Sequence, residues 1–271
     1  MASEEPTRTW ERPTVFYNEY VKYLFYIGSI LFVLWSMWEI RITPQRFLYG
    51  WSQATGLLAD MYPPAYGGWE SREMRLLRRG VSESIYIAMV ATVTGIAVSI
   101  PVAFMAAENL VPKPIYYLNR GIITISRSLH ALIVAIIFVK AFGFGAFAGV
   151  MTLTFKSIGF FSKLMAEDIE DIDMGQLEAI QATGANKIEA MIYGVVPQIM
   201  PRFVGLSVYR WDINLRASTI IGIVGAGGIG ATLVTSVDSF QYDLTASILL
   251  VIIAIVMIAE GVSSFVRGRV N

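Results

Sequence analysis

The sequence has no cysteine and only one histidine, His130, among its 271 residues. The lack of cysteine excludes disulfide bonds, thiolate nucleophiles and thiolate metal sites, and one histidine offers little to a histidine-rich metal centre. Lys and Arg together number 21, as do Asp and Glu, so the chain carries no net charge that would attract nucleic acid. We therefore expect neither a metal site nor a nucleic-acid partner.

Charged residues are also scarce. They make up 15% of the sequence, whereas about 25% is typical of a soluble domain. Hydrophobic residues make up 55%, and the mean hydropathy is +0.57. A globule of 30.0 kDa cannot hide that much apolar surface from water. The composition therefore predicts an all-α integral membrane protein and excludes a disordered chain or a secreted disulfide scaffold.

Six stretches are apolar over the length of about 20 residues that a helix needs to cross a bilayer. They are residues 21–40, 84–107, 121–139, 141–162, 203–225 and 244–266. We expect residues 1–80 to hold the first span and an external, arginine-rich part, in which residues 45–61 form an amphipathic helix on the membrane surface. Residues 81–271 are expected to form the core, with about six transmembrane helices in all.

Six spans put both termini on the same side of the membrane. Lysine and arginine counts favour a cytoplasmic N-terminus, although the arginines of residues 41–80 then lie outside. We therefore expect a multi-pass protein of the cell membrane with both termini in the cytoplasm. For any single arginine of residues 41–80, contact with solvent or lipid headgroups is the favoured interpretation.

The polar stretch 163–202 contains the first functional signal, the segment LEAIQATGANKIEAMIYGVVP at residues 177–197. Gly184 suits the left-handed position that ends a first short helix, and Asn186 can cap a second one. The second helix has one apolar stripe at i, i+3, i+4 and i+7. The stripe consists of Ile188, Met191, Ile192 and Val195. Such an elbow can dock in a groove of a partner, or it can pack on its own helices.

This segment resembles the EAA loop of ABC-importer permeases, which reads Glu-Ala-Ala, three residues, Gly, nine residues, Ile-x-Leu-Pro. The matching positions are Glu178, Ala179, Gly184 and Pro197, and the departures are Ile180, Gly194 and Val196. In that family the loop is a coupling helix that sits in a cleft of a cytoplasmic ATPase subunit. The resemblance therefore implies an ATPase-coupling role for Glu178, Ala179, Gly184, Ile188, Met191 and Pro197.

Further motifs are similar to the permease of phosphonate importers, with phosphite permeases as close relatives. They follow in order over roughly residues 55–235: DMYPP (60–64), AAENLVP (106–112), FGFGAFAGV (142–150), ATGANK (182–187), YGVVPQIMP (193–201), LSVYRWDINLRAST (206–219) and VGAGGIG (224–230). The chain departs from the family at His130 and Ala131, where Pro or Asn and then Glu are expected. The resemblance implies a type I ABC-importer permease (MetI-like) fold with its coupling loop at about residues 167–200.

The resemblance also implies a function. It predicts a pore subunit, not itself an enzyme, that moves phosphonate or a related phosphorus oxyanion such as phosphite or phosphate into the cytoplasm by alternating access. The implied partners are two cytoplasmic ATPase subunits, an extracytoplasmic phosphonate-binding protein, a second permease copy in a homodimer, and the lipid bilayer. ATP and Mg would bind the ATPase subunit, and no cofactor is expected on this chain.

One glycine-rich segment fits a nucleotide-binding pattern. The segment GAGGIG at residues 225–230 fits the G-x-G-x-x-G pattern, and Asp243 lies near the expected acidic position. We reject a dinucleotide site, because a membrane-length run precedes the segment and no helix–strand pair follows it. The resemblance instead makes Gly225, Gly227, Gly228 and Gly230 a gate loop at the outer end of the fifth span. No G-x-x-x-x-G-K-[ST] motif is present.

Charged residues inside a span cost about 2.5–3.5 kcal/mol at the bilayer centre, so they are paired or face water. Asp212 and Arg216 are four residues apart on one helix face, which predicts a structural ion pair. Arg210 and Asn214 share nearly the opposite face. Arg210 is a candidate for an anion path, and pairing of Arg210 with Glu260 is an equally good alternative.

Arg127 and His130 lie three residues apart on one face of the third predicted span. Arg127 and Arg210 together could stabilise a tetrahedral oxyanion through charge-assisted hydrogen bonds. The candidates for the substrate path are therefore Arg127, His130, Arg210 and Asn214. A structural role is the favoured interpretation for the lone histidine.

Two other classes of function stay open. A passive anion channel would need no coupling loop. An intramembrane enzyme would need a nucleophile with a positioned base, and the sequence offers little for that role. The acidic cluster at residues 167–173 could hold a divalent ion, but helix capping is the favoured interpretation.

Overall fold

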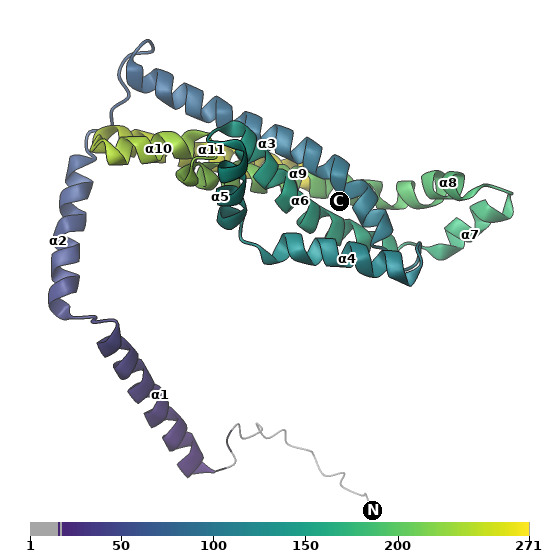
Figure 1. Cartoon of the computed structure of the whole chain (residues 1–271), viewed down its shortest axis with the longest axis horizontal. Helices are drawn as coiled ribbons and strands as arrows, with labels where there is room; N and C mark the ends of the chain where they lie inside the picture. Colours follow the sequence, from purple (N-terminus) through teal and green to yellow (C-terminus); the bar gives the residue numbers. More distant parts are fainter. Residues whose placement is uncertain (1–15, 17, 271) are drawn as a thin grey trace, which may run out of the picture. The chain divides into compact units, whose positions relative to one another are not determined.

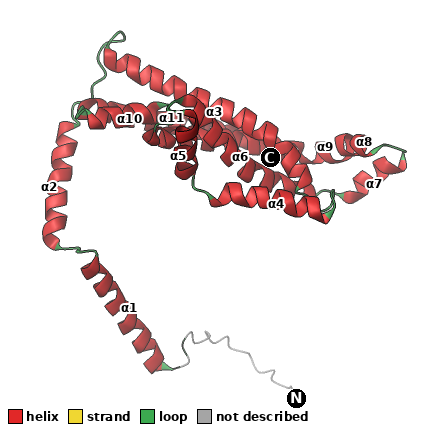
Figure 2. Ribbon diagram, in the orientation of Figure 1, coloured by secondary structure: helices red, strands yellow, loops and turns green. Residues whose placement is uncertain are grey.

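The computed structural model describes residue 16 and residues 18–270, and this part of the chain is helical without any strand (Figure 2). The chain divides into two compact units, Met1–Ala59 and Asp60–Asn271. The boundary that we expected at residue 80 falls inside a continuous helix, so the division comes earlier. The two ends of the chain, which we expected in the cytoplasm, lie outside the described residues.

The first unit holds two helices, α1 (Glu19–Glu39) and α2 (Pro44–Asp60), the last residue of which belongs to the second unit. α1 begins where the Asn18 side chain accepts a hydrogen bond from the Tyr20 N–H, and its apolar sequence is long enough to cross a membrane. α2 begins at a proline, a residue favoured at the first helical position because that position needs no N–H. The predicted surface helix over residues 45–61 corresponds to α2.

The second unit is built around long helices that run side by side (Figure 1). They are α3 (Arg72–Met105), α6 (Ala146–Glu170), α9 (Val196–Ile221) and α11 (Tyr242–Val270). Small residues line the contact between α3 and α6: a Cβ atom on Gly95 would lie 2.8 Å from Ser157 Oγ, and Ser162 Oγ donates to the Ser99 carbonyl at 3.0 Å. Such residues let helix backbones approach closely within a membrane.

Four helical segments of the described chain are long and apolar enough to cross a membrane. They are Glu19–Glu39, Arg72–Met105, Lys187–Asp238 and Tyr242–Arg269. A bent pair of helices would make a fifth. Of the six predicted windows, residues 141–162 fall on α6, which is not among these segments. α6 carries Lys156, Lys163 and several carboxylates, but it packs against α3, α4, α5 and α9, which shield it from lipid.

The window at residues 121–139, which was predicted to be one helix, is divided between two helices. The structure has α4 (Lys113–Ser128) and α5 (Ala131–Phe142), which meet at an angle of 93°. Leu129 is extended, and the His130 side chain caps α5 by accepting the Leu132 N–H at 3.3 Å. Neither glycine nor proline lies at the break, so the sequence offered no local signal for it.

The break is stabilised from a neighbouring helix. The ammonium group of Lys156 on α6 donates to the carbonyls of Ser126 and Leu129, both at 2.6 Å, and to that of Arg127 at 3.4 Å. The last carbonyls of a helix have no partner within the helix, and they carry the negative end of its dipole. Lys156 therefore provides the hydrogen bonds and the positive charge that the end of α4 lacks.

The remaining elements lie at the two ends of this unit (Figure 1). At one end, α7 (Met174–Ala182), α8 (Lys187–Ala190) and the π-helical turn η1 (Met191–Val195) form the elbow. At the other end, the 3-10 turn η2 (Gly222–Val224) leads through a glycine loop into α10 (Ile229–Asp238).

Replacement of Lys156 by methionine is expected to destabilise the protein. Each buried carbonyl left without a donor costs about 1–3 kcal/mol. Thermal unfolding of the purified chain in detergent, followed by tryptophan fluorescence, would measure the loss. Lys163→Met is the matched control, because Lys163 lies on the same helix and only pairs with Glu167 at 3.4 Å near the surface. Equal melting temperatures for Lys156→Met and the wild type would contradict the role of Lys156.

Candidate functional site

The elbow is anchored to the long helices by a buried apolar cluster. Leu177 of α7 and Val195 of η1 are 4% and 0% exposed, and they belong to the same cluster as Phe161, Met165 and Ile169 of α6. Because the elbow and α6 share one core, displacement of the elbow must displace α6 as well.

Two glycines shape the elbow. Gly184 has φ +88°, a left-handed conformation that glycine adopts without strain, and it follows α7 at the turn. The elbow has two arms: the first is α7, and the second is α8 with η1. Gly194 lies where the two arms meet, because a Cβ atom there would lie 3.0 Å from Leu177 Cδ1. The departure from the EAA pattern at Gly194 therefore allows the two arms to pack closely.

The second arm begins at a reciprocal cap. The Asn186 side chain accepts the N–H groups of Ile188 and Glu189 at 3.0 Å, and the Glu189 carboxylate accepts the Asn186 N–H at 2.8 Å. This capping box satisfies N–H groups that a helix start leaves without partners. The predicted helix–glycine–helix geometry, with Asn186 as the cap, is confirmed.

The predicted apolar stripe is split between surface and core. Ile188 and Ile192 are 69% and 50% exposed, whereas Val195 is buried and Met191 is partly buried. The π-helical turn changes the helical period, so it shifts Val195 inward and leaves Tyr193 67% exposed. The exposed ridge of the elbow therefore consists of Ile188, Ile192 and Tyr193, and the prediction was wrong for Val195.

The other predicted coupling residues lie near this ridge in the chain. Glu178, Ala179 and Gly184 are exposed on the first arm and the turn. Pro197 is exposed in the first turn of α9, which continues directly from η1. The structure thus presents this set on the surface of one elbow, apart from the partly buried Met191.

The acidic cluster at residues 167–173 serves caps and ion pairs. Asp173 caps α7 by accepting the Gly175 N–H at 2.9 Å, and Asp168 lies 3.5 Å from Arg202. Burial raises the pKa of the Asp168 carboxyl, while Arg202 acts in the opposite direction. Within the described part of the chain, no group of three His, Cys, Asp or Glu side chains could hold a metal ion.

An arginine clamp that sequence reasoning missed braces the base of the elbow. One nitrogen of Arg120 on α4 contacts both carboxylate oxygens of Glu170 at 2.8 Å, and its Nε donates to the Ala106 carbonyl at 2.9 Å. Glu170 also accepts the Glu108 N–H at 2.8 Å. The clamp joins α4, the end of α6 and the AAENLVP segment. That segment was the one part of the clamp that the sequence motifs had singled out.

Arg210 is buried inside the bundle, at 5% exposure. Its Nε donates to Ser157 Oγ at 2.8 Å, and its guanidinium lies 5.2 Å from the centre of the Phe160 ring. Asn214 donates to Thr92 Oγ1 at 2.9 Å. The alternative of an Arg210–Glu260 pair is wrong, because Glu260 is exposed and no such ion pair occurs among the described residues.

Arg127 and His130 do not join Arg210 in one site. Both are exposed at the break between α4 and α5. Arg127 packs beside Gly159 of α6, whereas Arg210 contacts Ser157, which points from a different face of that helix. The four predicted path residues therefore form two groups. Arg210 and Asn214 both donate to Ser157 Oγ, at 2.8 and 3.4 Å, whereas Arg127 and His130 lie at the break.

Asp212 and Arg216 form an ion pair within one helix. The Asp212 side chain is 1% exposed and that of Arg216 is 41% exposed. The pair thus neutralises a buried carboxylate, and Arg216 reaches from it toward the surface of the chain.

The glycine loop is a close-packed turn. Gly225, Gly227 and Gly228 have φ values of +87°, +79° and +75°. The Ile229 N–H donates to Ser84 Oγ of α3 at 2.9 Å, and a Cβ atom on Gly230 would collide with the Thr219 carbonyl oxygen. The glycines allow the end of α9 and the start of α10 to fold tightly against each other, without the strand–helix–strand unit of a dinucleotide site.

Gly230→Ala is expected to destabilise the protein by about 1–3 kcal/mol, since it adds a methyl group where no space exists. Gly261→Ala is the matched control, because a Cβ atom on Gly261 meets nothing within 4 Å. Melting temperatures in detergent should fall for the first variant alone. If Gly230→Ala has the same melting temperature as the wild type, the loop is not packed as described.

The comparisons with known proteins agree with this architecture. Residues 99–270 match the family described as the binding-protein-dependent transport system inner membrane component. The chain is 36% identical to the phosphite transport system permease protein PtxC of Stutzerimonas stutzeri, over 89% of this chain and 85% of that protein. It is 37% identical to the phosphate-import permease protein PhnE of Mycolicibacterium smegmatis, over 85% of this chain and 43% of that protein.

A solved structure shares the fold. The inward-facing MetNI methionine ABC transporter matches with a TM-score of 0.62 and 22% identity, over 73% of this chain and 97% of the matched chain. This similarity confirms the predicted MetI-like fold. The chain is a multi-pass membrane protein that belongs to the family of binding-protein-dependent transport system inner membrane components.

Proposed function

We propose that the chain is the permease subunit of an ABC importer that moves phosphonate, or a related oxyanion such as phosphite or phosphate, into the cytoplasm. The observation that carries this proposal is the elbow, which presents the exposed ridge of Ile188, Ile192 and Tyr193 at one end of the helix bundle. The substrate class is supported by the relatives named for phosphite and phosphate transport.

The proposed partners follow from the elbow and the family. Two cytoplasmic ATPase subunits would each receive an elbow, and two identical copies of this chain would form the pore. An extracytoplasmic binding protein would deliver the substrate. ATP and Mg would be bound by the ATPase, because this chain lacks the glycine-lysine loop that holds ATP phosphates. The chain would bind no cofactor of its own.

The ends of the helices support one orientation. The Gly145 N–H at the start of α6 donates to the Gly225 carbonyl of the glycine loop at 2.9 Å, and Glu170 at the other end of α6 joins the clamp beside the elbow. α6 therefore runs the full distance between the two ends. With the elbow in the cytoplasm, the glycine loop and α10 face outward, and both termini are cytoplasmic.

Closure of the two ATPase subunits would swing the elbows, and the core shared with α6 would carry that motion into the bundle. Rigid-body rocking of the two permease copies then exposes the path to alternate sides. The glycine loop would lie near the outer gate. Arg127 of α4 packs beside Gly159 of α6, and Arg210 of α9 contacts Ser157 of the same helix; each arginine would contact the passing anion.

Uptake by proteoliposomes tests this function. The complete complex of chain, ATPase and binding protein would be supplied with methylphosphonate, phosphite or phosphate. We expect uptake of at least one of these anions, dependent on both ATP and the binding protein. Flux without ATP, or no association with an ATPase, would contradict the proposal and favour a channel.

Charge on the elbow ridge is expected to uncouple the complex. Ile188→Asp should weaken association with the ATPase about tenfold or more, because loss of an apolar anchor costs about 2 kcal/mol. Co-purification and ATP-driven uptake would measure the effect. Ile188→Leu is the matched control and should keep both ATPase association and ATP-driven uptake.

Glu178→Lys and Gly184→Trp should also lose coupling, although the chain still inserts into the membrane. Normal ATP-driven uptake in Ile188→Asp, Glu178→Lys and Gly184→Trp would refute the coupling role.

A further inference from the structure

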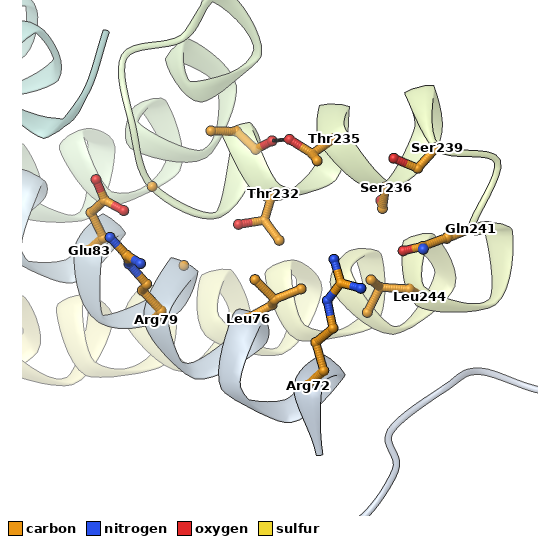
Figure 3. Close-up of a pocket in the computed structure, with 13 residues that line it drawn as sticks. Arg72, Leu76, Arg79, Glu83, Thr232, Thr235, Ser236, Ser239, Gln241 and Leu244 are labelled. Carbon is orange, nitrogen blue, oxygen red and sulfur yellow. Dashed lines mark hydrogen bonds between the residues drawn. The ribbon is translucent and has the colours of Figure 1, made fainter. Parts of the chain in front are cut away.

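A cavity of about 310 Å³ lies at the end of the bundle opposite the elbow, between the start of α3 and α10 (Figure 3). Its charged wall comes from α3 and includes Arg72 and Arg79. Its hydroxyl wall includes Thr232 and Thr235 of α10 and Ser239, which follows that helix. The volume is at the lower end of the range of about 300–1,000 Å³ that small-molecule sites occupy.

The two arginines of the cavity have no ion-pair partner among the described residues. Their neighbours on α3 are used differently: Arg75 donates to the Glu70 carbonyl, and Arg78 lies 4.8 Å from the centre of the Trp69 ring. Arg72 and Arg79 therefore keep their hydrogen-bond donors available to a ligand.

One carboxylate borders the cavity. Glu83 lies beside Arg79 at the inner edge of the site (Figure 3). The Glu73 carboxylate turns away toward Gly67, where Ser71 also lies. The cavity is thus lined by two positive charges and one negative charge, which favours an anion but limits its affinity.

The backbone gives no separate preference. The start of α10 lies beside the third turn of α3, because a Cβ atom on Gly80 would lie 3.0 Å from Thr232 Oγ1. Arg72, at the start of α3, lies at the other end of the cavity near Ser239 (Figure 3), so the preference for an anion rests on side chains. The guanidinium groups and the Thr232 and Ser239 hydroxyls supply donors that suit the oxygen atoms of a tetrahedral anion, whereas the Thr235 hydroxyl already donates to the Ala231 carbonyl at 2.9 Å.

We propose that this cavity binds a phosphate-type oxyanion through Arg72, Arg79 and the hydroxyls of α10. The anion is either a free phosphonate or phosphate, or the headgroup of an anionic phospholipid. Glu83 keeps the binding weak enough for release. This inference rests on the proposed function for one point only, namely that the cavity opens on the extracytoplasmic side.

The test uses the full chain in nanodiscs of phosphatidylcholine, without ATPase or binding protein. Methylphosphonate is titrated, and its binding is followed by phosphorus NMR. Arg72→Gln and Arg79→Gln should each weaken binding about tenfold or more, because a hydrogen bond to a charged group is worth about 1.5–3 kcal/mol. Arg78→Gln is the matched control, since it removes the same charge from the same helix outside the cavity, and it should bind like the wild type.

Glu83→Gln should change affinity in the opposite direction. Removal of the carboxylate beside Arg79 takes away a repulsion, so methylphosphonate should bind several-fold more tightly. A misfolded variant would not gain affinity, which separates this result from a loss of structure. Unchanged affinity in all these variants, or an equal loss in Arg78→Gln, would overturn the proposal.

A second version of this experiment identifies the source of the anion. Part of the phosphatidylcholine is replaced by phosphatidylglycerol, which has an anionic phosphodiester headgroup. Competition with methylphosphonate that depends on Arg72 and Arg79 would assign the site to lipid, whereas no competition would assign it to the free anion. Because the assay contains no ATPase, its failure would leave the importer proposal standing, and failure of uptake would leave the binding result standing.

Discussion

Every backbone carbonyl that lies within a membrane must find a donor inside the protein, and this constraint explains the centre of the fold. The span made by α4 and α5 is broken, so the carbonyls at the end of α4 need a partner. Lys156 supplies it from α6 with two hydrogen bonds of 2.6 Å. These hydrogen bonds also explain why the charge of Lys156 is tolerated in α6, which packs among four other helices.

The elbow and the bundle are mechanically one body in this structure. Leu177 and Val195 share a core with α6, and Arg120 ties the base of the elbow to α4 and to the AAENLVP segment. Force applied to the exposed ridge would therefore reach α6 through this shared core. At the other end of the bundle, the glycine loop leaves no space for an added methyl group on Gly230.

Local signals in the sequence were enough to predict the helical class, most of the spans and the capped elbow. Gly184 and Asn186 act through their own backbone neighbourhood, so their roles were visible in the residues around them. The break at Leu129 was not visible in its neighbouring residues, because the lysine that stabilises it lies 27 residues further along the chain. The burial of Val195 depends on a π-helical turn, which shifts the period that a stripe prediction assumes.

The contacts of Arg210 and the cavity of Arg72 and Arg79 could not be predicted for the same reason. Ser157 and the hydroxyls of α10 come from distant parts of the chain, and only packing of the helices brings them to these arginines. The resemblance to a family supplied the proposed coupling residues, but it held no information on which of their side chains are exposed.

In the proposed importer, the elbow contacts a separate ATPase subunit. Because the chain contains no cysteine, Ile188→Cys creates a single thiol on the ridge, which can carry a benzophenone photocrosslinker. We predict a crosslink to the ATPase subunit in the assembled complex, and none from Val237→Cys, an exposed position on α10 at the opposite end. An intact, active complex in which Ile188→Cys forms no crosslink to the ATPase would contradict the account.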